Sequence, residues 1–189
     1  MPRPNWFFGL PIDGSFVLTL PEPPPSIRRY HPDDVHLTLA FLGACGESGA
    51  ARALEALDER MKLGTPAVIE GTLGEVVPMG GSRGDYSALS ALLDRGRAEA
   101  TRLLAEWGDM LMLAAHGRRS TRPPKPHVTI ARPHRRATYR DREAGLEWAS
   151  ALDLRAVPAR LDRIALFTWS EDRRERLFRV VAERPFAGV

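Results

Sequence analysis

Two short segments of the chain share a pattern of residues that could carry out acid–base chemistry. The run HLTLAFL starts at His36 and the run HVTIAR starts at His127, so each histidine is followed two positions later by a threonine. Both runs are apolar or β-branched and lie between turn residues, which is typical of β-strands. Because alternate side chains of a strand share a face, we expect His36 beside Thr38 and His127 beside Thr129. The intervening side chains should then face the core: Leu37, Leu39, Phe41, Val128 and Ile130.

A polar face on an otherwise buried strand is costly unless that face lines a wet cleft. The sequence therefore predicts two imidazoles on opposite walls of one cleft. Histidine has an ordinary pKa of about 6.5, so it can hold or lend a proton near neutral pH. One neutral imidazole could take a proton from a nucleophile while a protonated one gives a proton to a leaving group. This division of roles suits the cleavage of a phosphodiester.

Three further side chains could bind the phosphate in such a reaction. The hydroxyls of Thr38 and Thr129 could each donate to a non-bridging oxygen, and Arg132 could add a bidentate contact. Strict alternation would place Arg132 on the face opposite His127. The strand must therefore end or bulge before Arg132, and Pro133 makes an end reasonable.

Other chemistries fit the sequence less well. A metal site would need carboxylates or further His or Cys side chains at ligand spacing, and neither motif strand offers them. Cys45 is the only cysteine, which excludes an intramolecular disulfide and fits the reducing cytoplasm, the location we expect. No histidine or asparagine partner for a thiol nucleophile is apparent, so a free, inert thiol is the better interpretation of Cys45.

Composition and charge place limits on the remaining function classes. The chain has 189 residues, 43% of them apolar and 27% charged, which is ordinary for a soluble globular protein, and a monomer is the default expectation. No apolar run approaches the roughly 18 residues that span a bilayer, and no secretory signal is apparent. The net charge is +3, and the basic residues cluster around the second motif: between residues 118 and 142, Asp141 is the only acid beside nine Lys and Arg residues. A solvated basic loop is one interpretation, and contact with phosphate or an RNA backbone is the other. The basic residues are Arg118, Arg119, Arg122, Lys125, Arg132, Arg135, Arg136, Arg140 and Arg142.

Hydrophobic periodicity and turn residues predict an α+β fold, in which hairpin-paired strands carry helices on one side. No glycine- or serine-rich linker divides the chain, so we expect a single domain over residues 1–189. The expected strands cover 6–10, 16–20, 35–42, 67–77, 86–93, 127–132, 160–168 and 177–182. The expected helices cover 48–63, with Ser48 as N-cap, 96–115 and 137–152.

The two motif segments, HLTLAFLG from His36 and PHVTIAR from Pro126, resemble the paired signatures of the 2H phosphoesterase superfamily. The resemblance is strongest to the bacterial and archaeal RNA 2′,3′-cyclic phosphodiesterases, also called 2′-5′ RNA ligases. It implies two pseudo-symmetric lobes, each a small antiparallel sheet with helices on the outside, whose motif strands face a central groove. One departure lies between Phe16 and Tyr30, where the family usually carries a sizeable helix and this chain has a proline-rich run.

The resemblance also implies an activity. The chain would hydrolyse RNA or nucleotide 2′,3′-cyclic phosphates to 2′-phosphates without a metal or other cofactor. His127 would activate water, His36 would protonate the departing 3′-oxygen, and Thr38, Thr129 and Arg132 would bind the phosphate. The reverse reaction would ligate RNA ends through a 2′-5′ bond. The alternative is a nucleotide- or RNA-binding module that keeps the phosphate site without useful turnover.

Overall fold

The computed structural model of the protein describes residues 3–81, 85–116, 118–119 and 123–188. Its strands are β1 (Trp6–Pro11), β2 (Ile27–Arg29), β3 (His36–Gly43), β4 (Ile69–Met79), β5 (Ala88–Leu93), β6 (His127–Pro133), β7 (Pro158–Leu161), β8 (Arg163–Trp169) and β9 (Phe178–Pro185). Its helices are α1 (Gly46–Leu63), α2 (Arg97–His116) and α3 (Tyr139–Ser150), with 3₁₀ turns η1 (Ser15–Thr19) and η2 (Pro32–Asp34).

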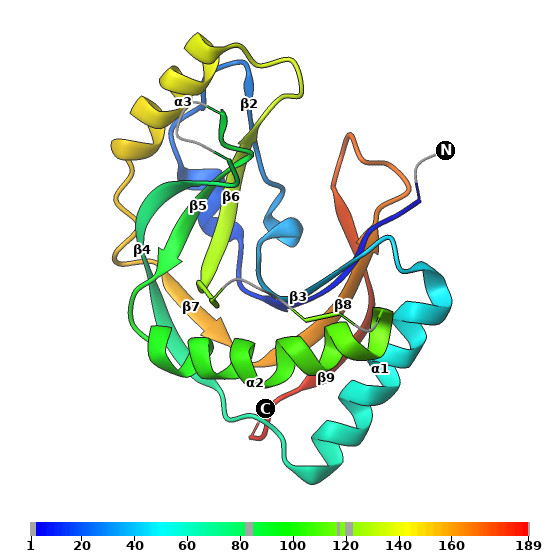
Figure 1. Ribbon diagram of the computed structural model, residues 1–189. Helices are drawn as coiled ribbons and strands as arrows, with labels where there is room; N and C mark the ends of the chain where they lie inside the picture. The colour runs from blue at the N-terminus through cyan, green and yellow to red at the C-terminus, as the bar shows by residue number, and fades with distance from the viewer. Residues whose placement is uncertain (1–2, 82–84, 117, 120–122, 189) are drawn as a thin grey trace.

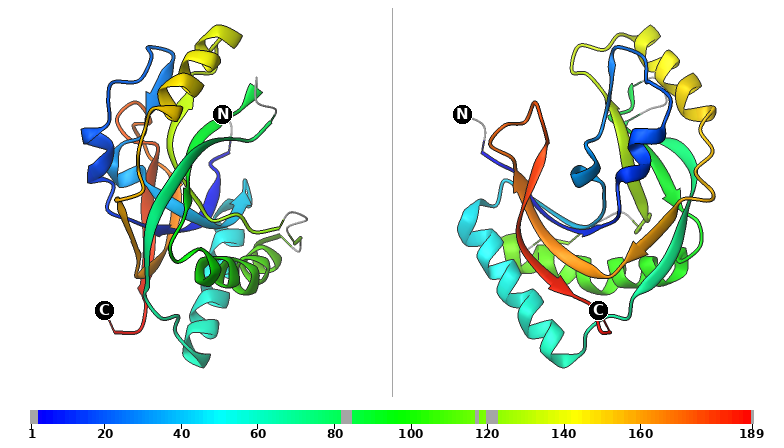
Figure 2. Two further views of the ribbon diagram at one scale, coloured as in Figure 1. Left: turned by 90° about the vertical axis from the view of Figure 1, so that its left-hand side faces the viewer. Right: turned by 180° about the vertical axis from the view of Figure 1, so that it is seen from behind.

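The strands form one strongly curved antiparallel sheet in the order β7-β4-β5-β6-β3-β1-β8-β9, with β2 added beside β6. Figure 1 shows the sheet bent into a half-barrel, with the helices on its outer side. Helices α1 and α2 lie side by side against β1 and β3, and α3 lies against β4, β2 and β6 at the opposite arm (Figure 2). The predicted α+β class and the two-lobed arrangement are confirmed.

The two arms of the sheet meet at the motif strands. Strands β3 and β6 are joined through a single pair of Cα partners, Leu37 and Val128. Strand β3 continues the arm that contains β1, β8 and β9, and β6 continues the arm that contains β5, β4 and β7. Each arm therefore contributes one motif to the junction.

The helices are stabilised by apolar stripes that pack on the sheet and by capping residues at their ends. In α2 the stripe of Ala100, Leu103, Trp107 and Leu111 is buried, as its spacing near 3.6 residues predicts. Gly108 in this helix lies so close to β3 that an added Cβ would be 2.9 Å from the Leu39 carbonyl oxygen. Only a glycine allows α2 to approach the motif strand this closely.

Helices α3 and α1 begin with different local structures. Thr138 and Asp141 form a capping box that begins α3, inside the predicted range. The prediction of Ser48 as the N-cap of α1 is wrong. The chain turns at Gly46, with φ of 74°, so the helix begins there with Cys45 as N-cap.

Three other expectations are corrected by the structure. Residues 16–20 are not a strand, because local hydrogen bonds such as Val17 N–H to the Gly14 carbonyl (3.0 Å) wind them into η1. The strand expected over 160–168 is divided at Asp162, so that β7 pairs with β4 while β8 pairs with β1. The three-residue strand β2 was not predicted, and with η1 it forms the described regular structure between Ser15 and Tyr30.

Candidate active site

The pairing of Leu37 with Val128 brings the two motifs face to face. Both side chains are fully buried, so their neighbours along each strand point to the opposite face of the sheet. Because the strands are antiparallel, His36 lies across from Thr129 and Thr38 lies across from His127. The two histidines are then diagonal neighbours, which in a regular antiparallel pair are about 7–8 Å apart. A single phosphate group fits between side chains at that separation.

The two imidazoles are oriented by matching hydrogen bonds. His36 Nδ1 lies 2.7 Å from the Asp34 carbonyl oxygen, and His127 Nδ1 lies 2.6 Å from the Lys125 carbonyl oxygen. A carbonyl can only accept, so in both rings Nδ1 carries a hydrogen and donates it. In the neutral rings Nε2 is left as a proton acceptor. The two motifs therefore present the same tautomer from opposite strands.

Aromatic rings surround His36. Phe7 of β1 stacks on it with centroids 4.7 Å apart, Phe167 of β8 is 5.1 Å away, and Phe178 of β9 makes an edge contact at 5.6 Å. Gly9 provides the room for this arrangement, since an added Cβ would lie 3.0 Å from Cδ2 of His36. Only 8% of His36 is exposed, so it is fixed in position as well as in tautomer.

This burial changes the acidity of His36. The loss of water around the ring lowers the pKa of His36 to about 4, although the hydrogen bond to Asp34 raises it. A positive charge on His127 lowers the pKa of His36 further, which agrees with the two rings facing the same space. Without a bound anion, His36 is therefore neutral at neutral pH. His127 is less enclosed than His36, since its side chain is half-buried.

The second threonine has a partner that the sequence did not reveal. Ser90 of β5 is the cross-strand partner of Thr129, and their hydroxyl oxygens are 3.1 Å apart. Ser90 is fully buried. If Ser90 donates, the hydroxyl hydrogen of Thr129 stays free for another acceptor. No local pattern marks Ser90 in the sequence, because its role depends on the register between β5 and β6.

A bulge in β6 resolves the expected difficulty with Arg132. Thr129 pairs with Ser90 but Ala131 pairs with Leu89, so Ile130 is an extra residue in β6. Ile130 and Ala131 are both fully buried, and alternation resumes after them with the faces exchanged. Arg132 therefore returns to the face that carries His127 and Thr129.

Strand β3 has a bulge at the equivalent position. Gly9 pairs with Thr38 and Phe8 pairs with Ala40, which leaves Leu39 as the extra residue. Leu39 and Ala40 are both buried, and Phe41 is then 55% exposed on the face of the motif. The expectation that Phe41 faces the core is wrong, because the bulge shifts the alternation by one residue. The expected burial of Leu37, Leu39, Val128 and Ile130 is confirmed.

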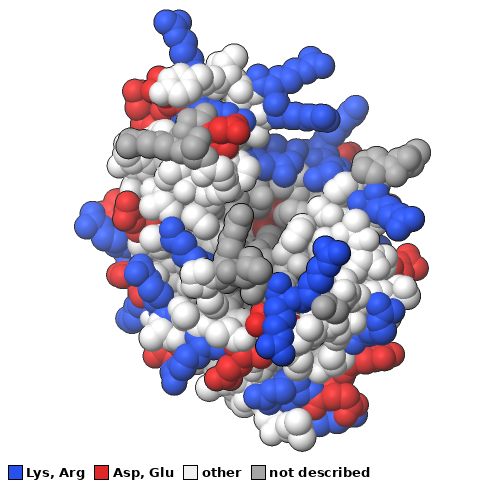
Figure 3. All heavy atoms as spheres, in the orientation of Figure 1, with Lys and Arg blue, Asp and Glu red and all other residues white. Residues whose placement is uncertain are grey.

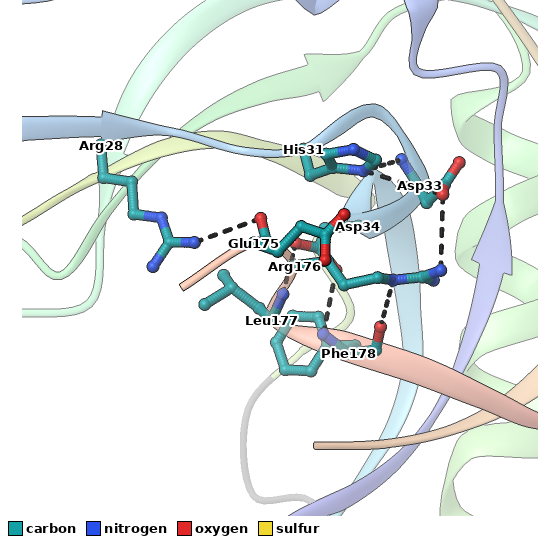
Figure 4. Close-up of polar contacts among 8 residues, drawn as sticks. All are labelled: Arg28, His31, Asp33, Asp34, Glu175, Arg176, Leu177 and Phe178. Atoms are coloured by element: carbon teal, nitrogen blue, oxygen red, sulfur yellow. Dashed lines mark hydrogen bonds and ion pairs between the residues drawn. The ribbon is translucent and has the colours of Figure 1, made fainter. Parts of the chain in front are cut away.

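A buried carboxylate holds the C-terminal strand against the site. The Asp34 oxygens accept the backbone N–H groups of Leu177 (2.7 Å) and Phe178 (2.9 Å), as Figure 4 shows. Asp34 is fully buried, so these hydrogen bonds compensate the removal of its charge from water. The same residue accepts the His36 Nδ1 hydrogen through its carbonyl. Asp34 thus connects His36 with the strand that carries Phe178.

A groove of about 830 Å³ opens beside the motifs. Thr38 and His127 line it together with the exposed ring of Phe41 and with Leu104 and Met112 of α2. Figure 3 shows a hollow at the centre of this face, with Lys and Arg side chains gathered along its upper rim. The site therefore combines polar motif side chains with an apolar wall large enough for a nucleoside.

The remaining candidates have other surroundings. Burial raises the pKa of the Cys45 thiol, which opposes a nucleophilic role. Within the described residues there is no group of three or more His, Cys, Asp or Glu side chains that could hold a metal ion. No helix in that part of the chain is long and apolar enough to cross a membrane. Arg142 of the basic segment donates to the Tyr86 carbonyl and pairs with Asp85, which is a structural role, and Arg122 lies outside the described residues.

Comparison with known proteins places the fold. No protein-family model and no curated protein matches the sequence. Among solved structures, Escherichia coli LigT in complex with 3′-AMP matches with a TM-score of 0.69 at 17% identity, over 98% of this chain and 99% of that one. A protein described as a phosphoesterase matches with a TM-score of 0.66 at 19% identity, over 98% and 99% of the two chains.

A more distant neighbour is Usb1 of Kluyveromyces marxianus, with a TM-score of 0.54 at 14% identity, over 86% of this chain and 92% of that one. LigT has also been solved with ATP, with NADP⁺ and with phosphate. At these identities the likeness shows a shared fold, which is the two-lobed fold of LigT.

Proposed function

We propose that the protein is a 2H phosphoesterase that hydrolyses 2′,3′-cyclic phosphates of RNA or nucleotides to 2′-phosphates, with His36 and His127 as its acid–base pair. The supporting observation is the antiparallel pairing of Leu37 with Val128, which directs both His-x-Thr motifs toward one space. The fold shared with LigT, which binds nucleotides and phosphate in its solved complexes, agrees with this substrate class.

In the proposed reaction, a water oxygen attacks phosphorus and the bond from phosphorus to the 3′-oxygen breaks. One imidazole takes a proton from the water at its Nε2, and the other gives its Nε2 proton to the 3′-oxygen. The product keeps the phosphate on the 2′-oxygen. Both Nε2 atoms have the required orientation because both Nδ1 atoms donate to main-chain carbonyls.

Thr38, Thr129 and Arg132 bind the phosphate oxygens in this proposal. Hydroxyl and guanidinium donors aimed at the non-bridging oxygens stabilise the charge that grows there during attack. The bulge at Ile130 supports the role of Arg132, since it returns the guanidinium to the face of His127. No step in this scheme requires a metal or an organic cofactor.

We assign the base to His127 and the acid to His36, following the family resemblance. His36 has a pKa of about 4 in the free protein, so the phosphate must raise it when substrate binds. A nearby negative charge has that effect on an imidazole. Once protonated, a ring enclosed by Phe7, Phe167 and Phe178 is a strong proton donor.

The assignment can be tested with a leaving group that needs no proton. An aryl phosphodiester releases a phenolate, so the variant that lacks the acid should keep much of its activity on this substrate. We expect His36→Ala to retain aryl diester cleavage relative to His127→Ala, while both lose activity on the cyclic phosphate. The opposite order would reverse the two roles.

The function itself is tested by incubating the purified protein with adenosine 2′,3′-cyclic phosphate in EDTA and following the product by ³¹P NMR. We expect the 2′-monophosphate, and we expect His36→Ala and His127→Ala each to lose about 10²–10⁴-fold in rate while remaining folded. A 3′-monophosphate product, or activity that disappears in EDTA, would contradict the proposal.

The same assay addresses the alternative of a binding module. Such a module would bind 2′-AMP or RNA with strong salt dependence but leave the cyclic phosphate unchanged. Ligation through a 2′-5′ bond would use the same residues in reverse, so a positive ligation assay would be compatible with hydrolysis.

A further inference from the structure

Two arginines lie directly opposite each other on neighbouring strands near the site. Arg28 of β2 and Arg132 of β6 are Cα partners in an antiparallel pair. Side chains at such positions point to the same face, and like charges placed there destabilise the sheet. This arrangement is favourable only where an anion or another acceptor lies between the guanidinium groups.

A third arginine joins them from the turn between β8 and β9. The guanidinium of Arg28 donates to the carbonyls of Arg173 (2.9 Å) and Arg174 (2.7 Å). It also donates to the Glu175 carbonyl at 3.5 Å, the contact that Figure 4 shows. These bonds hold the turn against β2. The Arg173 guanidinium lies 4.2 Å from the ring centroid of Trp169. Its Nε is buried and has no hydrogen-bond partner in the described structure.

The arginines of this cluster, Arg28, Arg132 and Arg173, form no ion pairs with acids among the described residues. Burial lowers the pKa of Arg173, and the positive charges of Arg132 and Arg28 lower it further. The negative charge of Asp34 raises the pKa of Arg173, but both Asp34 oxygens accept backbone N–H groups and form no ion pair with this guanidinium. An unpaired buried donor among three like charges is the environment of an anion site.

We propose that Arg173 and Arg28 bind a second phosphate of the substrate, the one attached to its 5′-oxygen, beside the reacting phosphate that Arg132 binds. This inference rests on the proposed function. In a nucleoside 2′,3′-cyclic phosphate both the 2′- and 3′-oxygens are occupied, so the 5′-oxygen is the only place on the ribose for another phosphate. In RNA that group is the internucleotide phosphate. The cluster therefore selects oligonucleotide ends, or 5′-phosphorylated nucleotides, over simple cyclic nucleosides.

The experiment compares the binding of adenosine 2′-monophosphate and adenosine 2′,5′-bisphosphate by isothermal titration calorimetry at one ionic strength. The proteins are the native chain, Arg173→Met and Arg174→Met. Methionine keeps an unbranched side chain against Trp169 and removes the guanidinium. Arg174 is the exposed neighbour of Arg173, so its variant removes the same net charge from the same turn and serves as the matched control.

We expect the native protein to bind the bisphosphate roughly tenfold or more tightly than the monophosphate, as one charge-assisted contact supplies. Arg173→Met should abolish that preference, and Arg174→Met should keep it. Equal affinities in the native protein, a preference that survives in Arg173→Met, or a preference lost equally in Arg174→Met would each overturn the proposal.

A kinetic arm separates this inference from the proposed function. The native protein should open 5′-phosphoadenosine 2′,3′-cyclic phosphate with a higher kcat/KM than adenosine 2′,3′-cyclic phosphate, and a dinucleotide should show the same gain if the diester is accepted. Turnover without a 5′-phosphate preference would contradict the subsite alone. A bisphosphate preference without turnover of either cyclic substrate would contradict the hydrolase and leave the anion site supported.

Discussion

Replacing His36 with asparagine should remove a large part of the pH dependence of the free energy of unfolding. The pKa of His36 is about 4 in the folded chain and about 6.5 when the chain is unfolded. Between these values the unfolded state binds more protons, so the folded state loses stability as the pH falls. The loss begins near pH 6.5 and is complete below pH 4. Its full size is about 3 kcal/mol, of which about 2 kcal/mol is lost by pH 5.

Asparagine is the suitable replacement, because its side-chain nitrogen lies near the position of Nδ1. The hydrogen bond to the Asp34 carbonyl can therefore be kept while the titrating group is removed. Urea unfolding of both proteins at pH 7 and at pH 5 gives a double difference in which the other ionisable groups cancel. We expect the native protein to lose about 2 kcal/mol more than His36→Asn over this interval.

An NMR titration of the His36 ring provides the site-specific control. It should report Nδ1 as the protonated nitrogen at neutral pH and a midpoint near 4. Identical pH dependence for the two proteins, or a midpoint close to 6.5, would refute the claim that the aromatic enclosure excludes water from His36.

Three further substitutions test the supports of the site, each read out by kcat, KM and urea unfolding. Gly9→Ala should displace the His36 ring, which would lie only 3.0 Å from the new Cβ, and so lower kcat about tenfold with little effect on KM. An unchanged kcat would mean that the ring has room to move. Ser90→Ala should cost about fivefold in kcat/KM through loss of the hydrogen bond to Thr129, and an unaltered value would remove Ser90 from the site. Phe41→Ala should change the free energy of unfolding by no more than about 0.5 kcal/mol, because the ring is 55% exposed. It should nevertheless raise KM for adenosine 2′,3′-cyclic phosphate. A stability loss typical of a core residue would contradict the placement of Phe41.

The sequence was sufficient to predict the strand geometry within each motif. Two His-x-Thr runs on strands predict a shared face for each pair, and this depends only on the alternation of side chains. The need for a bulge or a strand end before Arg132 was also apparent, because alternation alone placed it on the wrong face. The structure shows a bulge where Pro133 had suggested an end.

The surroundings of the site could not be read from local patterns. Phe7, Phe167 and Phe178 come from three strands that meet only after the sheet has formed. Ser90 is marked only by its register with Thr129, and the bulge that exposes Phe41 is set by the pairing of β1 with β3. The close packing of His36 on Gly9 was only weakly indicated, since a glycine inside a strand often marks a close approach by another group.

The central claim is that two imidazoles from different arms of the sheet contact one phosphate. A crystal structure of the protein with adenosine 2′-monophosphate tests this most directly. The expected result is Nε2 of His36 and Nε2 of His127 each within hydrogen-bonding distance of oxygens on the same phosphate, with Thr38 and Thr129 also donating to it. A phosphate bound to only one of the two rings, or bound elsewhere on the chain, would contradict the account.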